Sequence, residues 1–326
     1  FLGNNSVDIL SGQRDTTFGY SRGISKDNNT LIVGGFRLGD EEVRVWDWDS
    51  DNTIWKQRGL SINCETGETD CLTHGAEVSI SDDGDTIAVS SPFTSNNVGC
   101  SPYCGSTQVL DWNGSAWVRR GDKILGKELD GLGRSAHLSS DGNSIVISAR
   151  YNGDYLSFAG AVRIYDWNGS AWVQRGLDIY GQEEDEFMGA YHGSVDIDDS
   201  RDTIVIGSLQ NQEGNGRVRV FDWDGSAWVQ RGSNIDGEIN NNKGYYVSLS
   251  NDGNTVSSSS NGTTADVRVY DWNDNAWVQR GLNLMENESG TWSSLSGDAK
   301  TISTGTSGTD INGLDEAGEI RVYDWQ

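Results

Sequence analysis

Side chains that could carry out acid–base, nucleophilic or metal chemistry are sparse in this chain of 326 residues. The three histidines, His74, His137 and His192, could ligate a metal ion if they met in space. Their offsets from the neighbouring glycines differ, so we do not expect them to converge. The sequence has no Gly-x-Ser-x-Gly elbow and no phosphate-binding glycine loop. On these grounds we predict that the chain is not an enzyme.

Carboxylates offer one alternative chemistry, the cleavage of glycans. A glycan hydrolase or lyase needs acidic side chains gathered at one site. The candidates in this sequence are Asp154, Asp185 and Glu186. We keep a glycan-cleaving enzyme as the lowest-ranked of three functional hypotheses.

Two acidic runs could bind calcium through their oxygen atoms. One consists of Glu183, Glu184, Asp185 and Glu186, and the other covers residues 40–42. A solvated acidic loop is the favoured interpretation of the same residues. The sequence therefore allows bound calcium but requires no cofactor.

Four cysteines lie close together in the sequence, at Cys64, Cys71, Cys100 and Cys104. Without a Cys-x-x-Cys pair or histidines at zinc spacing, they predict two disulfides. The local pairing joins the first two and the last two, and the crossed pairings stay open. Disulfides indicate an extracellular compartment. The glycosylation sequons agree with that location; the candidate sites are Asn4, Asn28, Asn261 and Asn287, whereas Asn113 and Asn168 are expected to form turns.

The charge of the chain limits its partners. It has 24 basic and 49 acidic residues, and its formal net charge is −25. Such a surface repels nucleic acid and anionic membranes. No apolar stretch approaches the length of a membrane span. We therefore expect no nucleic-acid partner and no direct membrane insertion.

Aromatic and amide side chains in the longer connecting segments are the remaining candidates for a binding site. Aromatic rings combined with amides suit a glycan or a protein hot spot. The predicted ligand-binding residues are Phe93, Tyr103, Tyr151, Tyr155, Phe158, Phe187, Tyr191 and Asn211.

The elements that must position these residues repeat six times. A phrase similar to Arg-Val-Tyr-Asp-Trp recurs with its tryptophan 49–64 residues after the previous one, and five copies continue through a turn to a second tryptophan. A strand repeat of this length is typical of a β-propeller. We predict an all-β, six-bladed propeller with four antiparallel strands per blade. It forms one domain over 1–326, with repeats at 10–59, 60–121, 122–176, 177–232, 233–281 and 282–326, and the segment 1–9 joins the last blade to close the ring.

Within the repeat at 189–232, we expect strands over Tyr191–Ile197, Asp202–Ser208, Arg217–Trp223 and Ser226–Arg231. A two-residue turn at Asn168–Gly169 would pair Trp167 with Ser170 in the preceding repeat. Tryptophans that recur in every blade are expected to pack blade against blade. The short turns then lie on one face, and the long links, where binding residues concentrate, lie on the other.

Several motifs resemble a known repeat family. Phe18-Gly19, Leu31–Gly35 and the run Val-Arg-Ile-Tyr-Asp-Trp-Asn-Gly-Ser-Ala-Trp at 162–172 are similar to the FG-GAP repeat of integrin α-subunit propellers. The likeness is closer to the secreted microbial and algal relatives. It implies a propeller that takes part in extracellular recognition. The calcium loop of the family does not carry over, because turns such as Ser81–Asp85 are too short to surround the ion.

These observations lead to a ranked set of functions. The first is a secreted, non-enzymatic propeller that mediates extracellular protein or glycan recognition, or adhesion, through its long-loop face. The second is a structural subunit of an extracellular fibre, coat or adhesive, for which self-assembly is expected.

Overall fold

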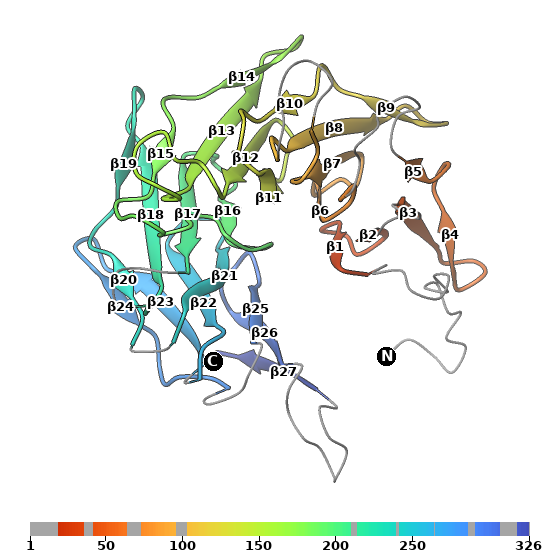
Figure 1. Ribbon diagram of the computed structural model, residues 1–326. Helices are drawn as coiled ribbons and strands as arrows, with labels where there is room; N and C mark the ends of the chain where they lie inside the picture. The colour runs from red at the N-terminus through yellow and green to blue at the C-terminus, as the bar shows by residue number, and fades with distance from the viewer. Residues whose placement is uncertain are drawn as a thin grey trace. The chain divides into compact units, whose positions relative to one another are not determined.

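The computed structural model describes residues 19–35, 42–63, 73–95, 103–209, 214–238, 241–263, 265–285, 291–306 and 318–325. Over these ranges the chain is an all-β, six-bladed propeller whose blades are sheets of antiparallel strands (Figure 1). The contacts divide the chain into a first unit, Phe1–Asn143 with Trp167–Trp172, and a second unit, Ser144–Asp166 with Val173–Gln326. In the described residues no helix is long and apolar enough to cross a membrane.

Two sheets belong wholly to the first unit. The first contains β1 (Ser21–Ile24), β2 (Thr30–Gly35), β3 (Glu42–Asp49) and β4 (Ile54–Gln57), with β5 (Ile62–Asn63) beside β3. The next contains β6 (Glu77–Ile80), β7 (Thr86–Ser91), β8 (Ser106–Trp112) and β9 (Trp117–Arg119), with β10 (Ile124–Leu125) beside β8. The third sheet has strands in both units: β11 (Leu132–Leu138), β12 (Ser144–Ala149), β13 (Ala161–Trp167), β14 (Trp172–Gln174) and β15 (Ile179–Tyr180).

The other three sheets belong to the second unit. One contains β16 (Val195–Ile197), β17 (Thr203–Ser208), β18 (Arg217–Trp223) and β19 (Trp228–Gln230), with β20 (Ile235–Asp236) beside β18. The next contains β21 (Lys243–Leu249), β22 (Thr255–Ser260), β23 (Val267–Trp272) and β24 (Trp277–Gln279). The last described sheet contains β25 (Trp292–Leu295), β26 (Thr301–Thr306) and β27 (Glu319–Asp324). The segment 1–9, which we expected to close the ring, lies outside the described residues.

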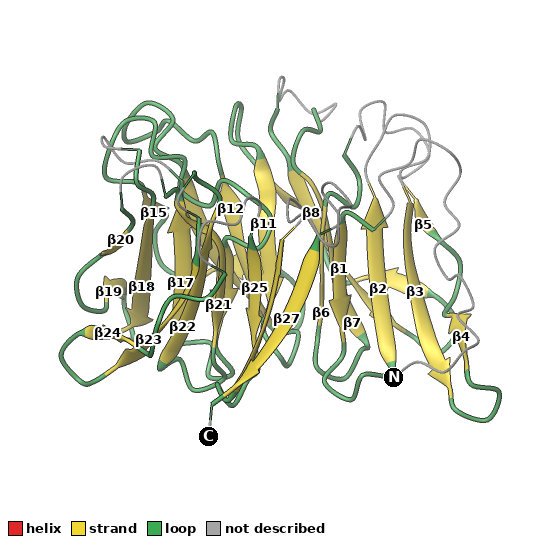
Figure 2. Cartoon of the chain, turned by 90° about the horizontal axis from the view of Figure 1, so that it is seen from below, coloured by secondary structure: helices red, strands yellow, loops and turns green. Residues whose placement is uncertain are grey.

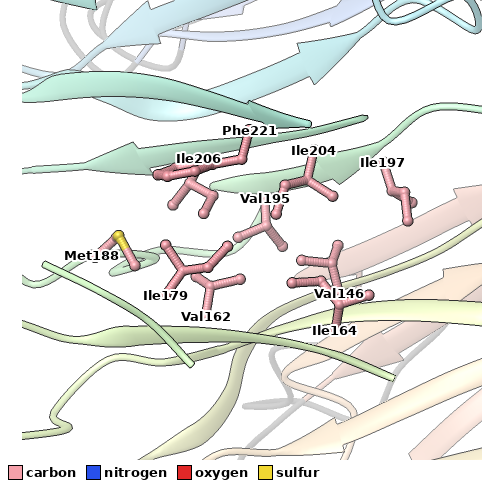
Figure 3. Packing of buried hydrophobic residues seen from close by; sticks show 10 residues of the cluster. All are labelled: Val146, Val162, Ile164, Ile179, Met188, Val195, Ile197, Ile204, Ile206 and Phe221. Carbon is pink, nitrogen blue, oxygen red and sulfur yellow. The ribbon is translucent and has the colours of Figure 1, made fainter. Parts of the chain in front are cut away.

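The second strand of a blade is covered on both of its faces. Every residue of β7, β12, β17 and β22 is buried. Strands that are covered on both faces have sequences made of continuous small and apolar residues, and these four strands do. Figure 3 shows the resulting core in the second unit, where Val146 and Ile164 of one sheet pack in the same cluster as Ile204 and Ile206 of the next.

The turn between the first two strands of a blade closes on its own side chains. At 81–86, Ser81 Oγ donates to Asp83 Oδ1 over 2.6 Å, and the Asp85 amide donates to the same oxygen over 2.9 Å. The Thr86 amide donates to Ser81 Oγ over 3.0 Å. This is the compact turn that the sequence predicted, and its carboxylate is already occupied by protein donors.

The turn between the third and fourth strands differs from the prediction. In the described blades the two tryptophans lie directly opposite each other, as Trp223 and Trp228 do. The predicted two-residue turn is therefore wrong, and the loop has four residues. The side chain of the first loop residue explains this loop length. Asn168 Oδ1 accepts hydrogen bonds from the amides of Ser170 and Ala171, both over 2.9 Å.

The repeated arginine that follows the second tryptophan locks neighbouring blades together. Trp228 Nε1 donates to the Arg175 carbonyl over 3.1 Å, and the Arg175 guanidinium lies 5.9 Å from the Trp223 ring and 5.7 Å from the Trp228 ring. Arg175 Nη1 also donates to the Arg201 carbonyl over 2.7 Å. The same contacts recur along the chain. The recurring tryptophans therefore pack blade against blade, as expected.

The two kinds of connection leave a sheet from opposite ends of its third strand. In the second unit, β19 pairs with the end of β18 at Trp223, whereas β20 pairs with its beginning at Arg217 and Val218. The short turn and the long link therefore lie at opposite edges of the sheet, which can be followed for β18, β19 and β20 in Figure 2. The long links carry the candidate site.

Candidate functional site

Two long loops of the second unit, 150–160 after β12 and 181–194 after β15, are joined along their backbones. The amides of Asp185, Phe187 and Met188 donate to the carbonyls of Ser157, Phe158 and Ala159 over 2.9, 3.1 and 2.9 Å. The Gly181 amide donates to the Gly160 carbonyl over 3.0 Å. Because the backbone polar groups are paired in this way, the two loops form one layer.

A buried ion pair anchors this layer to the sheet below it. The Glu186 carboxylate is paired with the Arg219 guanidinium of β18, and their side chains are 0% and 1% exposed. Glu186 also accepts hydrogen bonds from the Glu183 amide over 3.2 Å and from Ser208 Oγ over 2.9 Å. Burial lowers the pKa of Arg219 while the Glu186 charge opposes that shift. Losing either partner would leave an uncompensated buried charge.

The anchor determines which way the next side chains face. Glu186 and Met188 are both completely buried, and Phe187 between them is half-buried. Phe158 and Phe187 each have a φ of 49°, the left-handed region that costs an ordinary residue roughly 1–2 kcal/mol. Such conformations persist where the surroundings impose them, and they cluster at binding sites.

The loop layer presents a set of residues that we name the aromatic–arginine cluster: Arg150, Tyr151, Phe158, Phe187 and Tyr191. The Phe158 and Phe187 rings stack with centroids 6.0 Å apart, and Tyr151 meets them edge-on at 6.5 and 6.4 Å. The Arg150 guanidinium lies 5.0, 5.5 and 5.3 Å from the rings of Tyr151, Phe187 and Tyr191. Aromatic and cation–π pairs of this geometry stabilise one another.

Further rings continue from the cluster. Tyr191 lies 4.5 Å from Tyr245, which lies 5.2 Å from Tyr246, and Tyr246 stacks on His192 at 5.6 Å. These four side chains are half-buried. We had expected a strand over Tyr191–Ile197, but β16 begins only at Val195, because the Ser194 amide turns back to the Tyr191 carbonyl over 3.2 Å. That turn leaves Tyr191 in the loop layer.

The predicted ligand-binding residues fall into separate groups. Tyr151, Phe158, Phe187 and Tyr191 meet in the cluster, whereas Tyr155, 66% exposed, stacks on Tyr180 at 5.8 Å. In the first unit, the Phe93 and Tyr103 rings lie 5.9 Å apart. Asn211 lies outside the described residues. The binding role of these residues stays a prediction.

The acidic run that we considered for calcium is divided by the fold. Glu186 turns inward to Arg219, and Glu183 Oε1 lies 3.2 Å from Arg217 Nη1, while Glu184 and Asp185 are exposed. Within the described part of the chain, no group of three or more histidine, cysteine, aspartate or glutamate residues is arranged to hold a metal ion. Calcium binding stays a prediction. Glu186, a candidate carboxylate for glycan cleavage, is enclosed in its ion pair with Arg219, and its catalytic role stays a prediction.

Most of the residues on which the extracellular expectation depends fall outside the described ranges. Cys64, Cys71 and Cys100 do so, whereas Cys104 is completely buried. Disulfide pairing stays a prediction. Of the glycosylation candidates, Asn4 and Asn287 also lie outside the described ranges, Asn28 lies in an exposed turn with a φ of 62°, and Asn261 is half-buried. Asn113 caps a turn in the way that Asn168 does, as predicted.

Sequence reasoning missed Arg150, His192, Tyr245 and Tyr246 as members of this aromatic surface. A signal for Arg150 was present. Among the six residues that directly follow a second strand, it is the only charged one; the others are Phe36, Pro92, Leu209, Asn261 and Ser307. A charged residue that departs from an otherwise uncharged repeat position is the kind of exception that marks a site.

Comparison with known proteins identifies the fold and nothing finer. No family model and no curated protein matches the chain. Membership of the FG-GAP family therefore stays a prediction.

Solved structures that resemble the chain are propellers of low sequence identity. A functionally unknown protein of Desulfotomaculum acetoxidans is 11% identical, with a TM-score of 0.61 over 97% of this chain and 84% of that one. The periplasmic gluconolactonase of Pseudomonas aeruginosa is 12% identical, with a TM-score of 0.56 over 85% and 75%. A Bacteroides fragilis protein assigned as a candidate 6-phosphogluconolactonase is 12% identical, with a TM-score of 0.57 over 94% and 87%. At these identities the likeness shows the fold alone.

These neighbours correct one inference from the sequence. We predicted that the chain is not an enzyme, because it has no familiar catalytic motif. That prediction is wrong, since propellers similar to this one include lactone-hydrolysing enzymes. A propeller can host catalysis on its loops without a short motif that is recognisable in the sequence.

Proposed function

We propose that the chain recognises a carbohydrate outside the cell and that the aromatic–arginine cluster of the second unit is the binding site. The observation that carries the proposal is the arrangement of three aromatic rings around Arg150 on two joined loops, with the Phe158 ring stacked on that of Phe187. The extracellular setting rests on the cysteines and the sequons of the sequence.

The chemistry of the cluster suits a sugar ring. Pyranose rings have an apolar face of C–H groups and a polar rim of hydroxyls. Phe158, 43% exposed, offers an apolar surface, and the tyrosines combine an apolar ring with a hydroxyl that can donate or accept a hydrogen bond. Because the ion pair of Glu186 and the backbone bonds hold the loops, little ordering is needed on binding.

The experiment is a glycan-array screen of the full chain, followed by calorimetric titration of the sugars that bind. Tyr151→Ala and Phe187→Ala each remove a ring from the cluster, and each should weaken binding roughly 10-fold, about 1.4 kcal/mol. Leu60→Ala, which removes an exposed apolar side chain of the first unit outside the predicted binding residues, is the control and should leave the affinity unchanged. If no glycan binds, or if the cluster variants bind as the unaltered chain does, the proposal fails.

A second candidate is the hydrolysis of a sugar lactone. The observation that favours it is the presence of gluconolactonase and 6-phosphogluconolactonase assignments among propellers with TM-scores of 0.55–0.57. Incubation with gluconolactone, with acid release followed against the spontaneous rate, tests it. Release that is faster than in buffer, and that is lost in Tyr151→Ala, would place catalysis at the cluster.

A further inference from the structure

Arg150 differs from the other arginines that stack on aromatic rings in this protein. The repeated arginines Arg58, Arg120, Arg175, Arg231 and Arg280 lie over tryptophan rings, and each has a carboxylate partner. Arg175 Nε lies 2.6 Å from Asp166, and Arg231 Nε lies 2.6 Å from Asp222. In these structural contacts a neighbouring carboxylate therefore compensates the positive charge of each arginine.

Among the residues that the structure describes, no carboxylate compensates the Arg150 charge in this way. Its guanidinium contacts the rings of Tyr151, Phe187 and Tyr191, and its Nε is buried without a hydrogen-bond partner. In the portion of the chain that the structure describes, no carboxylate forms an ion pair with it. A buried donor left without a hydrogen-bond partner is destabilising. In a chain with 49 acidic residues, the missing partner calls for an explanation.

We propose that the missing partner is the carboxylate of the ligand and that the cluster takes an acidic sugar, a uronic acid. This inference rests on the proposed function and gives its ligand a chemical class. The planar guanidinium can bind a carboxylate through two parallel N–H···O bonds, which a neutral hydroxyl cannot reproduce. The flanking rings would contact the C–H face of the same sugar.

The net charge of −25 does not prevent an anion from reaching this site. At physiological salt, exposed charges are screened over about 8 Å, so distant carboxylates contribute little at Arg150. The contacting residues Tyr151, Phe187 and Tyr191 are uncharged, and the Arg150 Nε is buried. A charge pair formed in such surroundings is stronger than one formed in open solvent.

The test compares matched acidic and neutral ligands by calorimetric titration of the full chain. The probes are the trimers of galacturonic, glucuronic and mannuronic acid, each alongside its fully methyl-esterified form. Esterification removes the charge and leaves the ring intact. We expect at least one acid to bind 10-fold or more tightly than its ester.

Variants at Arg150 connect that difference to the guanidinium. Arg150→Gln should abolish the preference, so that the acid and its ester bind with equal affinity. Arg150→Lys keeps the charge without the planar fork and should retain only part of the preference, so it also serves if the glutamine variant does not fold. Lys300→Gln, which removes an exposed positive charge elsewhere in the second unit, is the matched control and should bind as the unaltered chain does.

Each outcome distinguishes this inference from the function on which it rests. If acid and ester bind equally, and Tyr151→Ala abolishes both, carbohydrate recognition stands and the acidic preference is overturned. If the acid preference survives both Arg150 variants, the site of the carboxylate is wrong. If no uronate and no other glycan binds, both proposals fail together.

Discussion

Glu186 and Lys243 are two completely buried ionisable side chains, and they differ in whether an opposite charge lies beside them. The charge of Glu186 is matched by Arg219. Among the described residues, the hydrogen-bond partner of Lys243 Nζ is the Tyr270 hydroxyl, 3.3 Å away. Burial is the largest influence on Lys243, and it lowers the pKa of that amine to about 8, against the opposing attraction of the Asp266 carboxylate. The folded chain therefore holds this proton less tightly than the unfolded chain does.

This difference predicts that stability rises with pH between about 8 and 10. In that window the unfolded lysine, with a pKa near 10.5, keeps its proton while the folded lysine loses it. Below pH 8 both forms are charged, and the buried charge costs on the order of 3 kcal/mol. Lys243→Met should therefore raise the free energy of unfolding at pH 7 and remove the slope, as measured by urea unfolding from pH 7 to 9.5.

The unfolding measurements stop at pH 9.5 because burial raises the pKa of Tyr270. At higher pH that shift would make stability fall as pH rises. Lys300→Met is the control, because its amine is 74% exposed and its pH profile should match that of the unaltered chain. Parallel profiles for the unaltered chain and Lys243→Met would show that the buried amine does not carry the pH dependence.

At the scale of elements, the contact between successive blades depends on the glycine that follows four of the five repeated arginines: Gly59, Gly121, Gly176 and Gly232. Gly232 has a φ of 72°, and a Cβ placed there would lie 2.7 Å from Trp272 Cζ3. Gly176 has the same relation to Trp223. The repeated Arg-Gly pair thus combines a guanidinium over the tryptophans with a residue that has no side chain to collide with them.

Replacing this glycine should cost more than backbone strain alone. Gly232→Ala and Gly225→Ala both place alanine at a positive φ, but nothing lies within 4 Å of a Cβ at Gly225. We expect the first variant to be less stable than the second by about 1–3 kcal/mol, the usual cost of overpacking. Urea unfolding of the two variants measures the difference. Equal losses would mean that the tryptophans move aside freely.

At the scale of the whole molecule, the main electrostatic feature is the excess of acidic residues. A net charge of −25 repels itself in the compact state, and added salt screens that repulsion. We expect the melting temperature to rise by a few degrees between 20 and 500 mM NaCl. Choline chloride should act in the same way, and a flat or falling curve would contradict self-repulsion.

The same measurement examines the predicted calcium binding. At matched ionic strength, calcium chloride should raise the melting temperature above its sodium chloride value only if the ion binds the folded chain. The structure accounts for two carboxylates of the acidic run, Glu183 and Glu186, through their arginine partners. A calcium effect would therefore point to other oxygen ligands.

Much of the fold could be predicted because it repeats. The strand Arg217–Trp223 was expected at the bounds that β18 has, and the turn at 81–86 was expected as a tight turn. The register of the tryptophan hairpin could not be predicted in this way, because Asn-Gly suits a two-residue turn as well as a four-residue one. The choice depended on the hydrogen bonds that the asparagine side chain makes to the loop amides.

The sequence by itself determined the strand repeat, the blade architecture, the packing role of the tryptophans and the aromatic content of the long loops, because these depend on local patterns that recur. Only the tertiary structure decided that Tyr151, Phe187 and Tyr191 meet around Arg150 and that Phe158 stacks on Phe187. The long loops do not repeat between blades, so no periodicity describes them. Their contacts are set by a buried ion pair, by backbone bonds between loops and by left-handed φ values at phenylalanines, all of which arise only when distant segments pack together.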